Sequence, residues 1–218
     1  MTVVLFSGGL DSTVLLTKAR RHGPATALSF FYGQRHSTEL EHAQRIAEAL
    51  GVPHYVIDLQ DVGRHLVGSA LTDDAVAVPD GHYAEATMRS TIVPGRNAIL
   101  LSIAAGYAAA HGDQEVWFGA HGGDHHIYPD CRPQFVGAID EALYRGSGVR
   151  VRAPFVVMTK ADIVASGNKL GAPLHLTWSC YRGGEHHCGT CGTCVERQEA
   201  FVLAGVLDPT SYGTAVPR

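Results

Sequence analysis

A glycine-rich turn between an apolar run and a helix-like segment constrains this chain most. The run Val3–Phe6 has no polar alternation, which is typical of a parallel strand buried on both faces. Ser7-Gly8-Gly9-Leu10-Asp11-Ser12 follows it, and residues 13–21 are helix-like. Glycine lets the backbone approach a ligand closely, and the first amides of a helix have no internal partner and point at an anion. The turn is therefore predicted to bind phosphate.

Side chains of the same turn favour a nucleotide. Ser7 and Ser12 supply hydroxyl donors, and Asp11 supplies a carboxylate that can hold Mg²⁺ against phosphate oxygens. The turn lacks the lysine of a Walker A loop and the Gly-x-Gly-x-x-Gly spacing of a dinucleotide loop. Ser-Gly-Gly-x-Asp-Ser after a first strand resembles the PP-loop of the N-type ATP pyrophosphatases, which cleave ATP between its α and β phosphates. A glycine turn that only joins strand to helix is the alternative.

Strand-like and helix-like segments alternate through the first part of the chain. Residues 26–32 and 54–59 have the pattern of strands, and a capping box at Thr38–Glu41 opens the helix between them. This β-α-β-α-β beginning predicts an α/β fold, a doubly wound and mainly parallel sheet whose ligand lies at the carboxyl edge of the strands. The PP-loop resemblance implies that the sheet is of the adenine nucleotide alpha hydrolase type.

The rest of the chain continues this pattern after an irregular segment. Residues 61–90 are rich in proline, glycine and polar residues, and we expect them to form an insertion over the site. The segment 97–111 is apolar almost all round and predicts a buried helix. Further helices are expected over 133–144 and 160–170, and further strands over 115–118 and 149–153. We assign residues 1–172 to an ATP-binding and catalytic domain and residues 173–218 to a small zinc-binding region.

Charge and composition disfavour some classes of partner. The 218 residues carry a net charge of −4 without a lysine/arginine run, whereas a nucleic-acid-binding protein normally has a basic footprint. The first residues do not form a charged leader with an apolar core, and no apolar run reaches membrane-spanning length. We therefore expect a cytoplasmic protein without a membrane partner. In that compartment the five cysteines are more consistent with metal ligands or free thiols than with disulfides.

Four cysteines are grouped near the C-terminus. Cys180, Cys188, Cys191 and Cys194 have the spacing Cys-x7-Cys-x2-Cys-x2-Cys, with a glycine in each short gap. Such glycines permit the tight turns that let thiolates converge on one ion, and four sulfur ligands in a tetrahedron are typical of structural zinc. An iron–sulfur cluster is the alternative, because Cys-x2-Cys-x2-Cys also begins ferredoxin-type ligation.

Several short motifs together resemble one family. They are Tyr32-Gly33-Gln34-Arg35-His36, Val93-Pro94-Gly95-Arg96-Asn97, Tyr128-Pro129-Asp130-Cys131-Arg132 and Thr177-Trp178-Ser179-Cys180-Tyr181. With the PP-loop and the cysteine cluster, they resemble the QueC family of 7-cyano-7-deazaguanine (preQ0) synthases over nearly the whole chain.

The resemblance implies an ATP-dependent C–N ligase of queuosine biosynthesis. Such an enzyme converts 7-carboxy-7-deazaguanine with ammonia into a nitrile, through an acyl-adenylate and an amide. The implied partners are therefore ATP, ammonia and 7-carboxy-7-deazaguanine. The implied cofactors are structural Zn²⁺ and Mg²⁺ bound with ATP, and the family also suggests a homodimer.

Roles for individual residues follow from the same resemblance. Asp11, Arg96 and Lys160 form the expected catalytic set, in which Arg96 neutralises charge near the α-phosphate. A structural ion pair is the alternative for Arg96, and a surface lysine for Lys160. Residues expected to bind ATP are Phe6, Ser7, Gly8, Gly9, Leu10, Asp11, Ser12, Thr13, Val14, Leu15, Leu16 and Arg96. Residues expected to bind the deazapurine acid are Tyr32, Gln34, Arg35, His121, Asp124, Tyr128, Asp130 and Arg132, although either aspartate can instead cap a turn.

The chain departs from the family pattern beside the expected substrate loop. Phe31 stands where an acid is expected, and His125-His126-Ile127 stands where the pattern has aromatic-Ser-Gly. The acceptor of the activated carboxylate therefore has an alternative, a protein amine, as in QueC-like ligases of antiviral defence systems. The histidines of residues 121–126 line a pocket in our interpretation, with a second metal site as the alternative.

Two further classes of function stay open at the level of sequence. One is another PP-loop adenylating or tRNA-modifying enzyme, in which Cys131 would be the sulfur-transfer nucleophile. The other is a non-catalytic, ATP-binding partner subunit stabilised by zinc. An intact Ser-Gly-Gly-Leu-Asp-Ser turn favours catalysis over the second class.

Overall fold

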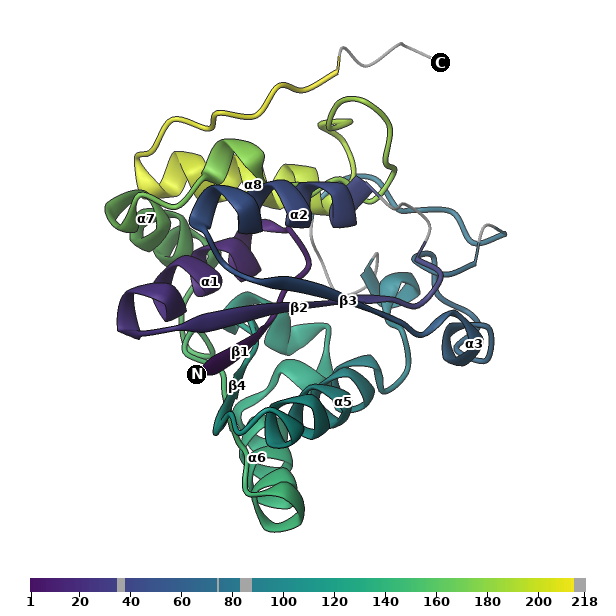
Figure 1. The fold of residues 1–218 in the computed structure, drawn as a ribbon. Helices are drawn as coiled ribbons and strands as arrows, with labels where there is room; N and C mark the ends of the chain where they lie inside the picture. The colour runs from purple at the N-terminus through teal and green to yellow at the C-terminus, as the bar shows by residue number, and fades with distance from the viewer. Residues whose placement is uncertain (35–37, 74, 83–87, 214–218) are drawn as a thin grey trace.

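The computed structural model describes residues 1–34, 38–73, 75–82 and 88–213, and within them the centre of the fold is a parallel sheet (Figure 1). The strand order is β3-β2-β1-β4-β5, and every neighbouring pair is parallel. The strands are β1 (Thr2–Leu5), β2 (Ala25–Phe31), β3 (His54–Asp58), β4 (Glu115–Trp117) and β5 (Arg150–Arg152). The predicted α/β, doubly wound sheet is thereby confirmed.

Helices cover both faces of the sheet (Figure 1). One face packs against α1 (Leu10–His22), α2 (Thr38–Leu50), α7 (Lys160–Leu170) and α8 (Gly192–Ala204), and the other against α5 (Arg96–Ala110) and α6 (Pro133–Ser147). Successive strand residues point to opposite faces, so Val4 joins the first apolar cluster and Val3 the second. Both valines are fully buried, which explains the unbroken apolar run of β1.

The predicted element boundaries shift by only a few residues. The helix expected over 160–170 is α7, and its N-terminus carries a capping box between Thr159 and Asp162. The helix expected over 133–144 continues to Ser147, because Gly148 (φ 75°) supplies the left-handed residue that ends it. Short helical turns fill the connections: α3 (Gln60–Gly63) and the 3-10 turns η1 (Arg89–Thr91), η2 (Gly122–His126), η3 (Pro129–Cys131) and η4 (Leu174–Leu176).

Helix α5 corrects one expectation, because only one of its faces is buried. Leu101, Ala104, Ala105 and Ala108 face the sheet, whereas Ser102, Gly106 and Ala109 are exposed. The residues on its exposed face are small, so the sequence of this segment showed no clearly polar side. By length and composition alone, residues 89–110 also pass as a membrane-spanning candidate. The backbone is broken at Gly95 (φ 65°), however, and α5 has 15 residues where a span needs about 20.

The strand order places a crevice beside β1. The chain leaves β1 toward β2 on one side, whereas β4 lies on the other, so the connections after β1 and β4 diverge at the carboxyl edge of the sheet. In open α/β sheets, ligands bind at such a switch point. The two connections approach closely here, because a Cβ on Gly119 would lie 3.6 Å from Cβ of Asp11. The turn singled out in the sequence therefore opens into this crevice.

The C-terminal segment is attached to the sheet domain through a buried arginine. Arg197 on α8 is fully buried, and its guanidinium donates to Thr177 Oγ1 (2.7 Å) and to the carbonyl of Leu174 (3.2 Å). It also forms an ion pair with Asp208 at 3.2 Å. Phe201, one turn further along α8, belongs to the same apolar cluster as α1. The guanidinium thus joins α8, the η4 connection and the segment after α8.

We expect Arg197→Leu to destabilise the protein strongly. The substitution leaves the Asp208 carboxylate and the groups around Thr177 without their partner, and breaking a buried ion pair in this way costs about 3–5 kcal/mol. Urea unfolding of the metal-loaded protein measures the loss. The matched control is Arg145→Leu, because the Arg145–Glu141 pair is exposed and such pairs contribute about 0–1 kcal/mol. Equal midpoints for the two variants would contradict the assigned role of Arg197.

Candidate active site and metal centre

A cavity of about 300 Å³ opens at the switch point of the sheet. The turn after β1 forms the floor of this cavity, where Ser7, Gly9, Asp11 and Ser12 line it. Its other walls come from the end of β2, the start of α2, the first turn of α5, the connection after β4, Lys160 and residues 178–181. Elements far apart in the sequence thus share one pocket, as expected at the carboxyl edge of a doubly wound sheet.

The turn after β1 is held open by its own hydrogen bonds. The Ser7 and Ser12 hydroxyls lie 3.1 Å apart, and Gly9 N donates to Ser7 Oγ at 3.2 Å. Gly8 has φ 80°, and a Cβ there would lie 2.6 Å from the carbonyl oxygen of Glu39. Trp178 N donates to the Gly8 carbonyl on another side. Gly8 is therefore required both by its backbone angle and by the close approach of α2.

A half-buried cluster of charges lies beside this turn. Lys160 Nζ is 3.0 Å from Asp11 Oδ2 and 3.0 Å from Glu196 Oε2. Burial raises the pKa of Asp11, but the charge of Lys160, its hydrogen bond and the other groups around Asp11 together outweigh this and leave the Asp11 pKa below its ordinary value. Burial lowers the pKa of Lys160, and the two carboxylates more than reverse that effect. Lys160 is therefore an ammonium ion that joins α1, α7 and α8.

His121 completes the cluster as a neutral donor. Its Nδ1 accepts a hydrogen bond from Gly123 N at 3.1 Å, so we assign the ring proton to Nε2. Nε2 lies 3.4 Å from Asp124 Oδ2 and 3.9 Å from Asp11 Oδ2. The ring is 1% exposed and is thus fixed in orientation. His121 Nε2 therefore faces the Asp124 carboxylate and also lies 3.4 Å from the Lys160 ammonium.

Arg96 enters the pocket from the first residue of α5. Its Nη1 donates to the Tyr32 hydroxyl at 3.4 Å, and the two side chains line the same wall. The next residue, Asn97, donates its backbone N–H to Asp130 Oδ2 at 3.2 Å. Asp130 thus satisfies one of the free amides at the N-terminus of α5 and orients the helix that carries Arg96.

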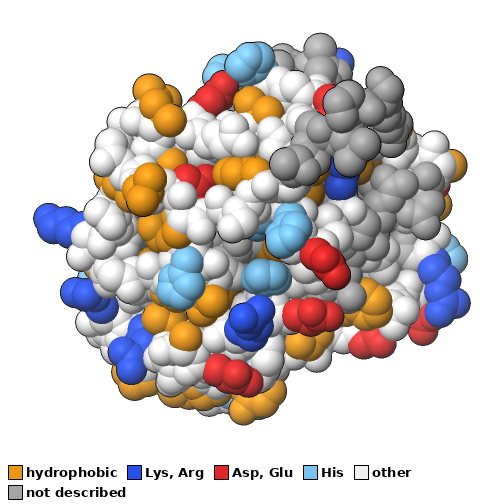
Figure 2. Space-filling view, turned by 90° about the horizontal axis from the view of Figure 1, so that it is seen from above, with side chains coloured by type: hydrophobic (Ala, Val, Ile, Leu, Met, Phe, Trp, Pro, Cys, Tyr) orange, Lys and Arg blue, Asp and Glu red, His pale blue; other side chains and the backbone are white. Residues whose placement is uncertain are grey.

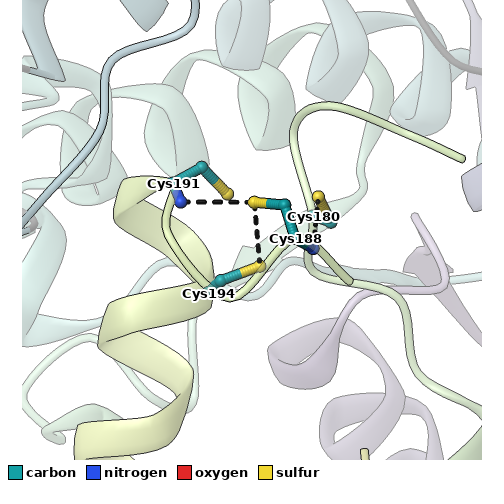
Figure 3. A group of neighbouring side chains, drawn as sticks. All are labelled: Cys180, Cys188, Cys191 and Cys194. Atoms are coloured by element: carbon teal, nitrogen blue, oxygen red, sulfur yellow. Dashed lines mark hydrogen bonds between the residues drawn. The ribbon is translucent and has the colours of Figure 1, made fainter. Parts of the chain in front are cut away.

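The four cysteines of the C-terminal region meet in one place (Figure 3). Their sulfur atoms all lie within 4.8 Å of one another, and the Cys188 and Cys194 sulfurs are 3.9 Å apart. Tetrahedral ligands with Zn–S bonds of about 2.3 Å are separated by about 3.8 Å. Backbone N–H groups also point at the sulfurs, as from Cys191 to Cys188 Sγ at 3.3 Å. The spacing and the donors fit a metal ion held by thiolates.

Hydrogen bonds within the cluster favour a thiolate even without an ion. Cys180 and Cys194 both donate to Cys191, and these bonds lower the pKa of Cys191 well below its ordinary value. Cys191 is fully buried and caps the N-terminus of α8, where the helix dipole also stabilises negative charge.

Comparison with known proteins gives the family. The sequence profile described as "Queuosine biosynthesis protein QueC" matches residues 1–205. The chain belongs to the QueC family. It is 57% identical to the 7-cyano-7-deazaguanine synthase of Brucella anthropi over 98% of this chain and 94% of that protein. The synthase of Brucella ovis gives the same identity and coverage.

Solved structures with low sequence identity share the fold of this QueC protein. The U34-tRNA thiolase NcsA of Methanococcus maripaludis, solved with its [4Fe-4S] cluster, has a TM-score of 0.51 at 12% identity. That match covers 100% of this chain and 77% of the thiolase. The NH3-dependent NAD synthetase of Campylobacter jejuni has a TM-score of 0.50 at 16% identity, covering 80% of this chain and 66% of that one.

The structure brings most of the predicted QueC site residues into one pocket. Those that line it are Phe6, Ser7, Gly9, Leu10, Asp11, Ser12, Tyr32, Gln34, Arg96, His121, Asp124, Tyr128 and Lys160. Thr13, Val14, Leu15 and Leu16 are instead fully buried beneath the turn and serve as its scaffold. Arg35 lies outside the described residues.

Two predicted substrate residues have partners away from the pocket wall. Asp130 binds the first turn of α5, which is the capping alternative considered for it. Arg132 is exposed, and its Nε donates to the carbonyl of His125 at 2.8 Å. Gln34 lines the pocket but uses its amide on β2, donating to the Phe30 carbonyl and accepting from Tyr32 N. Of these three side chains, only Gln34 lines the pocket.

Two acidic residues of the site were missed in the sequence. Glu196 contacts Lys160 from the helix that also carries Cys194, and Glu39 lines the pocket from the first turn of α2. Glu39 and Glu196 both sit on amphipathic helices, where an acidic residue usually faces solvent. Glu196 lies close to Cys194 in the sequence, and this was the signal that could have pointed to it.

We expect the purified protein to contain one metal ion per chain, and Cys188→Ser to lose it. Removing one sulfur leaves three ligands, and a structural site of this kind contributes on the order of 10 kcal/mol to folding. Elemental analysis and the melting temperature measure the effect. Cys131→Ser is the matched control, because Cys131 belongs to the apolar cluster on the other face of the sheet. Full metal content in the Cys188→Ser variant would contradict the assigned ligand set.

Proposed function

We propose that this chain is a 7-cyano-7-deazaguanine synthase. It converts 7-carboxy-7-deazaguanine, ATP and ammonia into the nitrile, AMP and pyrophosphate. The observation that carries the proposal is the cavity that joins the PP-loop to Arg96 and Lys160, in a chain that belongs to the QueC family. High identity to the Brucella synthases over nearly the full length supports the same assignment.

The first step activates the carboxylate. An oxygen of the substrate carboxylate attacks the α-phosphorus of ATP, the bond to the β-phosphate oxygen breaks, and pyrophosphate leaves. The amides at the start of α1 and the Ser7 and Ser12 hydroxyls would hold the phosphates. Arg96 and Lys160 would stabilise charge that develops on the α-phosphate and on the departing pyrophosphate.

Asp11 is the residue that we assign to Mg²⁺. Its Oδ1 is buried and has no hydrogen-bond partner within the described part of the chain, whereas Oδ2 pairs with Lys160. A hard cation prefers such a carboxylate oxygen and keeps phosphate oxygens among its other ligands. Mg²⁺ would supply further charge neutralisation on the phosphates when bound.

The later steps convert the acyl-adenylate into the nitrile. Ammonia forms a bond to the acyl carbon and AMP leaves, which gives the amide and releases a proton. The amide oxygen then attacks the α-phosphorus of a second ATP, and a second pyrophosphate leaves. Loss of AMP and of the N–H protons leaves the nitrile. Both adenylations use the same phosphate contacts, so one pocket serves the two halves of the reaction.

The deazapurine would bind between aromatic walls of the pocket. Tyr32 and Tyr128 contribute two of these walls, and Tyr128 is fixed by a hydrogen bond of 2.7 Å between its hydroxyl and that of Thr91. Asp124 and His121 line the same cavity and would meet the polar edge of the base.

The proposal extends to the cofactors and the assembly. We assign zinc to the four cysteines, residues 173–218 to the zinc-binding region, and residues 1–172 to ATP binding and catalysis. We also propose a cytoplasmic homodimer. Nucleic acid is not among the proposed partners: on the face shown in Figure 2, basic side chains are interspersed with acidic ones.

The test is incubation of the purified protein with ATP, Mg²⁺, an ammonium salt and 7-carboxy-7-deazaguanine. We expect free nitrile with AMP and pyrophosphate, measured by mass spectrometry of small molecules and of intact protein. A deazaguanine adduct on a protein amine, or AMP without nitrile, would contradict the proposed product. Iron and acid-labile sulfide in place of zinc would contradict the proposed metal.

We expect Lys160→Ala to lower turnover by about 100-fold or more, because it removes a charged donor from the developing phosphate charge. Zinc content should not change, because Lys160 contacts Glu196 and not the cysteines. Lys169→Ala is the matched control, since Lys169 is exposed in the last turn of the same helix. Wild-type turnover in the Lys160→Ala variant would remove Lys160 from the catalytic set.

A further inference from the structure

The proposed reaction needs an acceptor for the proton of ammonium. Ammonium is the prevailing form at neutral pH, yet only neutral ammonia has the lone pair that attacks an acyl-adenylate. A positioned base that takes this proton contributes about 10²–10⁴-fold to such a step. The inference below rests on the proposed function and concerns which residue supplies this base.

The groups beside Lys160 are unsuited to the task. His121 uses Nδ1 to accept from Gly123 N, and its Nε2 carries the ring proton. Asp11 and Glu196 are each paired with the Lys160 ammonium at 3.0 Å. Asp124 faces His121 Nε2 at 3.4 Å. A base for ammonium is therefore to be sought in another wall of the pocket.

Glu39 lies in a different wall, at the first turn of α2. The close packing of this turn on Gly8 fixes its backbone, with the Glu39 carbonyl oxygen 2.6 Å from the position of a Gly8 Cβ. The next turn holds Ala43 and Ile46 fully buried against the sheet, so the helix cannot withdraw without exposing core residues. The backbone that carries Glu39 is thus fixed at the edge of the PP-loop.

The surroundings of Glu39 suit exchange of a proton. Its carboxyl group forms no hydrogen bond with the described residues, and Arg96 is the charged group among them that acts on it. Burial raises the pKa of Glu39 to about 7, although Arg96 opposes the shift. A carboxyl group with that pKa can accept a proton and return it to solvent within a turnover.

Arg96 also places the electrophile near Glu39. In the proposed reaction Arg96 contacts the α-phosphate, which the acyl-adenylate joins directly to the acyl carbon. Arg96 and Glu39 line the same cavity, together with Tyr32 between β2 and α2. A cation held at Glu39 would therefore lie close to the carbon that it must attack.

We propose that Glu39 binds ammonium and accepts its proton in the amide-forming step. The Glu39 carboxylate takes one proton from NH4⁺ and becomes a carboxylic acid. The nitrogen lone pair forms the bond to the acyl carbon, the bond from that carbon to the AMP oxygen breaks, and AMP leaves with the electron pair. The added nitrogen then loses one further proton to solvent, and Glu39 returns its own proton to solvent.

The test compares two half-reactions in the Glu39→Gln variant of the metal-loaded protein. Without ammonium, exchange of labelled pyrophosphate into ATP in the presence of 7-carboxy-7-deazaguanine measures adenylation, and we expect it to stay within about threefold of wild type. With ammonium, we expect kcat/KM for ammonium to fall by about 100-fold or more. Glu41→Gln is the matched control, because Glu41 is exposed on the same helix.

Hydroxylamine separates a chemical role from a structural one. It is largely neutral at neutral pH and needs no base to free its lone pair, so the variant should form the hydroxamate at close to the wild-type rate. Equal losses with hydroxylamine and ammonium, or a loss of pyrophosphate exchange, would overturn the proposal and place Glu39 in substrate binding. Unchanged ammonium kinetics would overturn it as well. Wild-type protein without pyrophosphate exchange would instead overturn the proposed function.

Discussion

The ammonium group of Lys160 is the contact on which the site depends. Its two carboxylate partners come from α1, just after the phosphate-binding turn, and from α8, which carries Cys194 of the cysteine cluster. Three helices far apart in sequence therefore meet at one buried charge. A buried ammonium is costly unless it is paired, so this contact also fixes the relative position of α1, α7 and α8. The C-terminal region thereby shapes the pocket as well as gathering four cysteines that could hold a metal ion.

The packing around this contact divides the pocket by charge. Lys160 and Arg96 stand where the proposed reaction places phosphate, while Glu39 stands in the wall next to α2. Opposite charges can occupy one cavity because each is fixed by its own element, Arg96 by the capped start of α5 and Glu39 by the turn pressed on Gly8. A polyanionic nucleotide and a small cation could then bind side by side without competing for the same groups.

Sequence patterns predicted those features that depend on local order. The PP-loop, the parallel sheet and the converging cysteines follow from strand runs, glycines and spacing, which act between near neighbours in the chain. Features that depend on tertiary packing were not predictable in this way. Glu196 was overlooked because its partner becomes a neighbour only after folding. The contact of Asp130 with α5 also depends on folding, although a capping role was one of the two alternatives for this residue. The burial of Val14, Leu15 and Leu16 likewise depends on helices added later in the chain.

The protonation of Cys131, the cysteine outside the cluster, bears on which type of reaction the pocket can catalyse. Burial raises the pKa of Cys131 well above its ordinary value, and the nearby Asp124 and Asp130 carboxylates raise it further. Cys131 is therefore a thiol, whereas sulfur transfer needs a thiolate nucleophile. The other four cysteines are gathered in the metal cluster. Cys131 lines the pocket in this environment, and the charged groups of the pocket suit adenylation of an oxygen followed by attack of nitrogen.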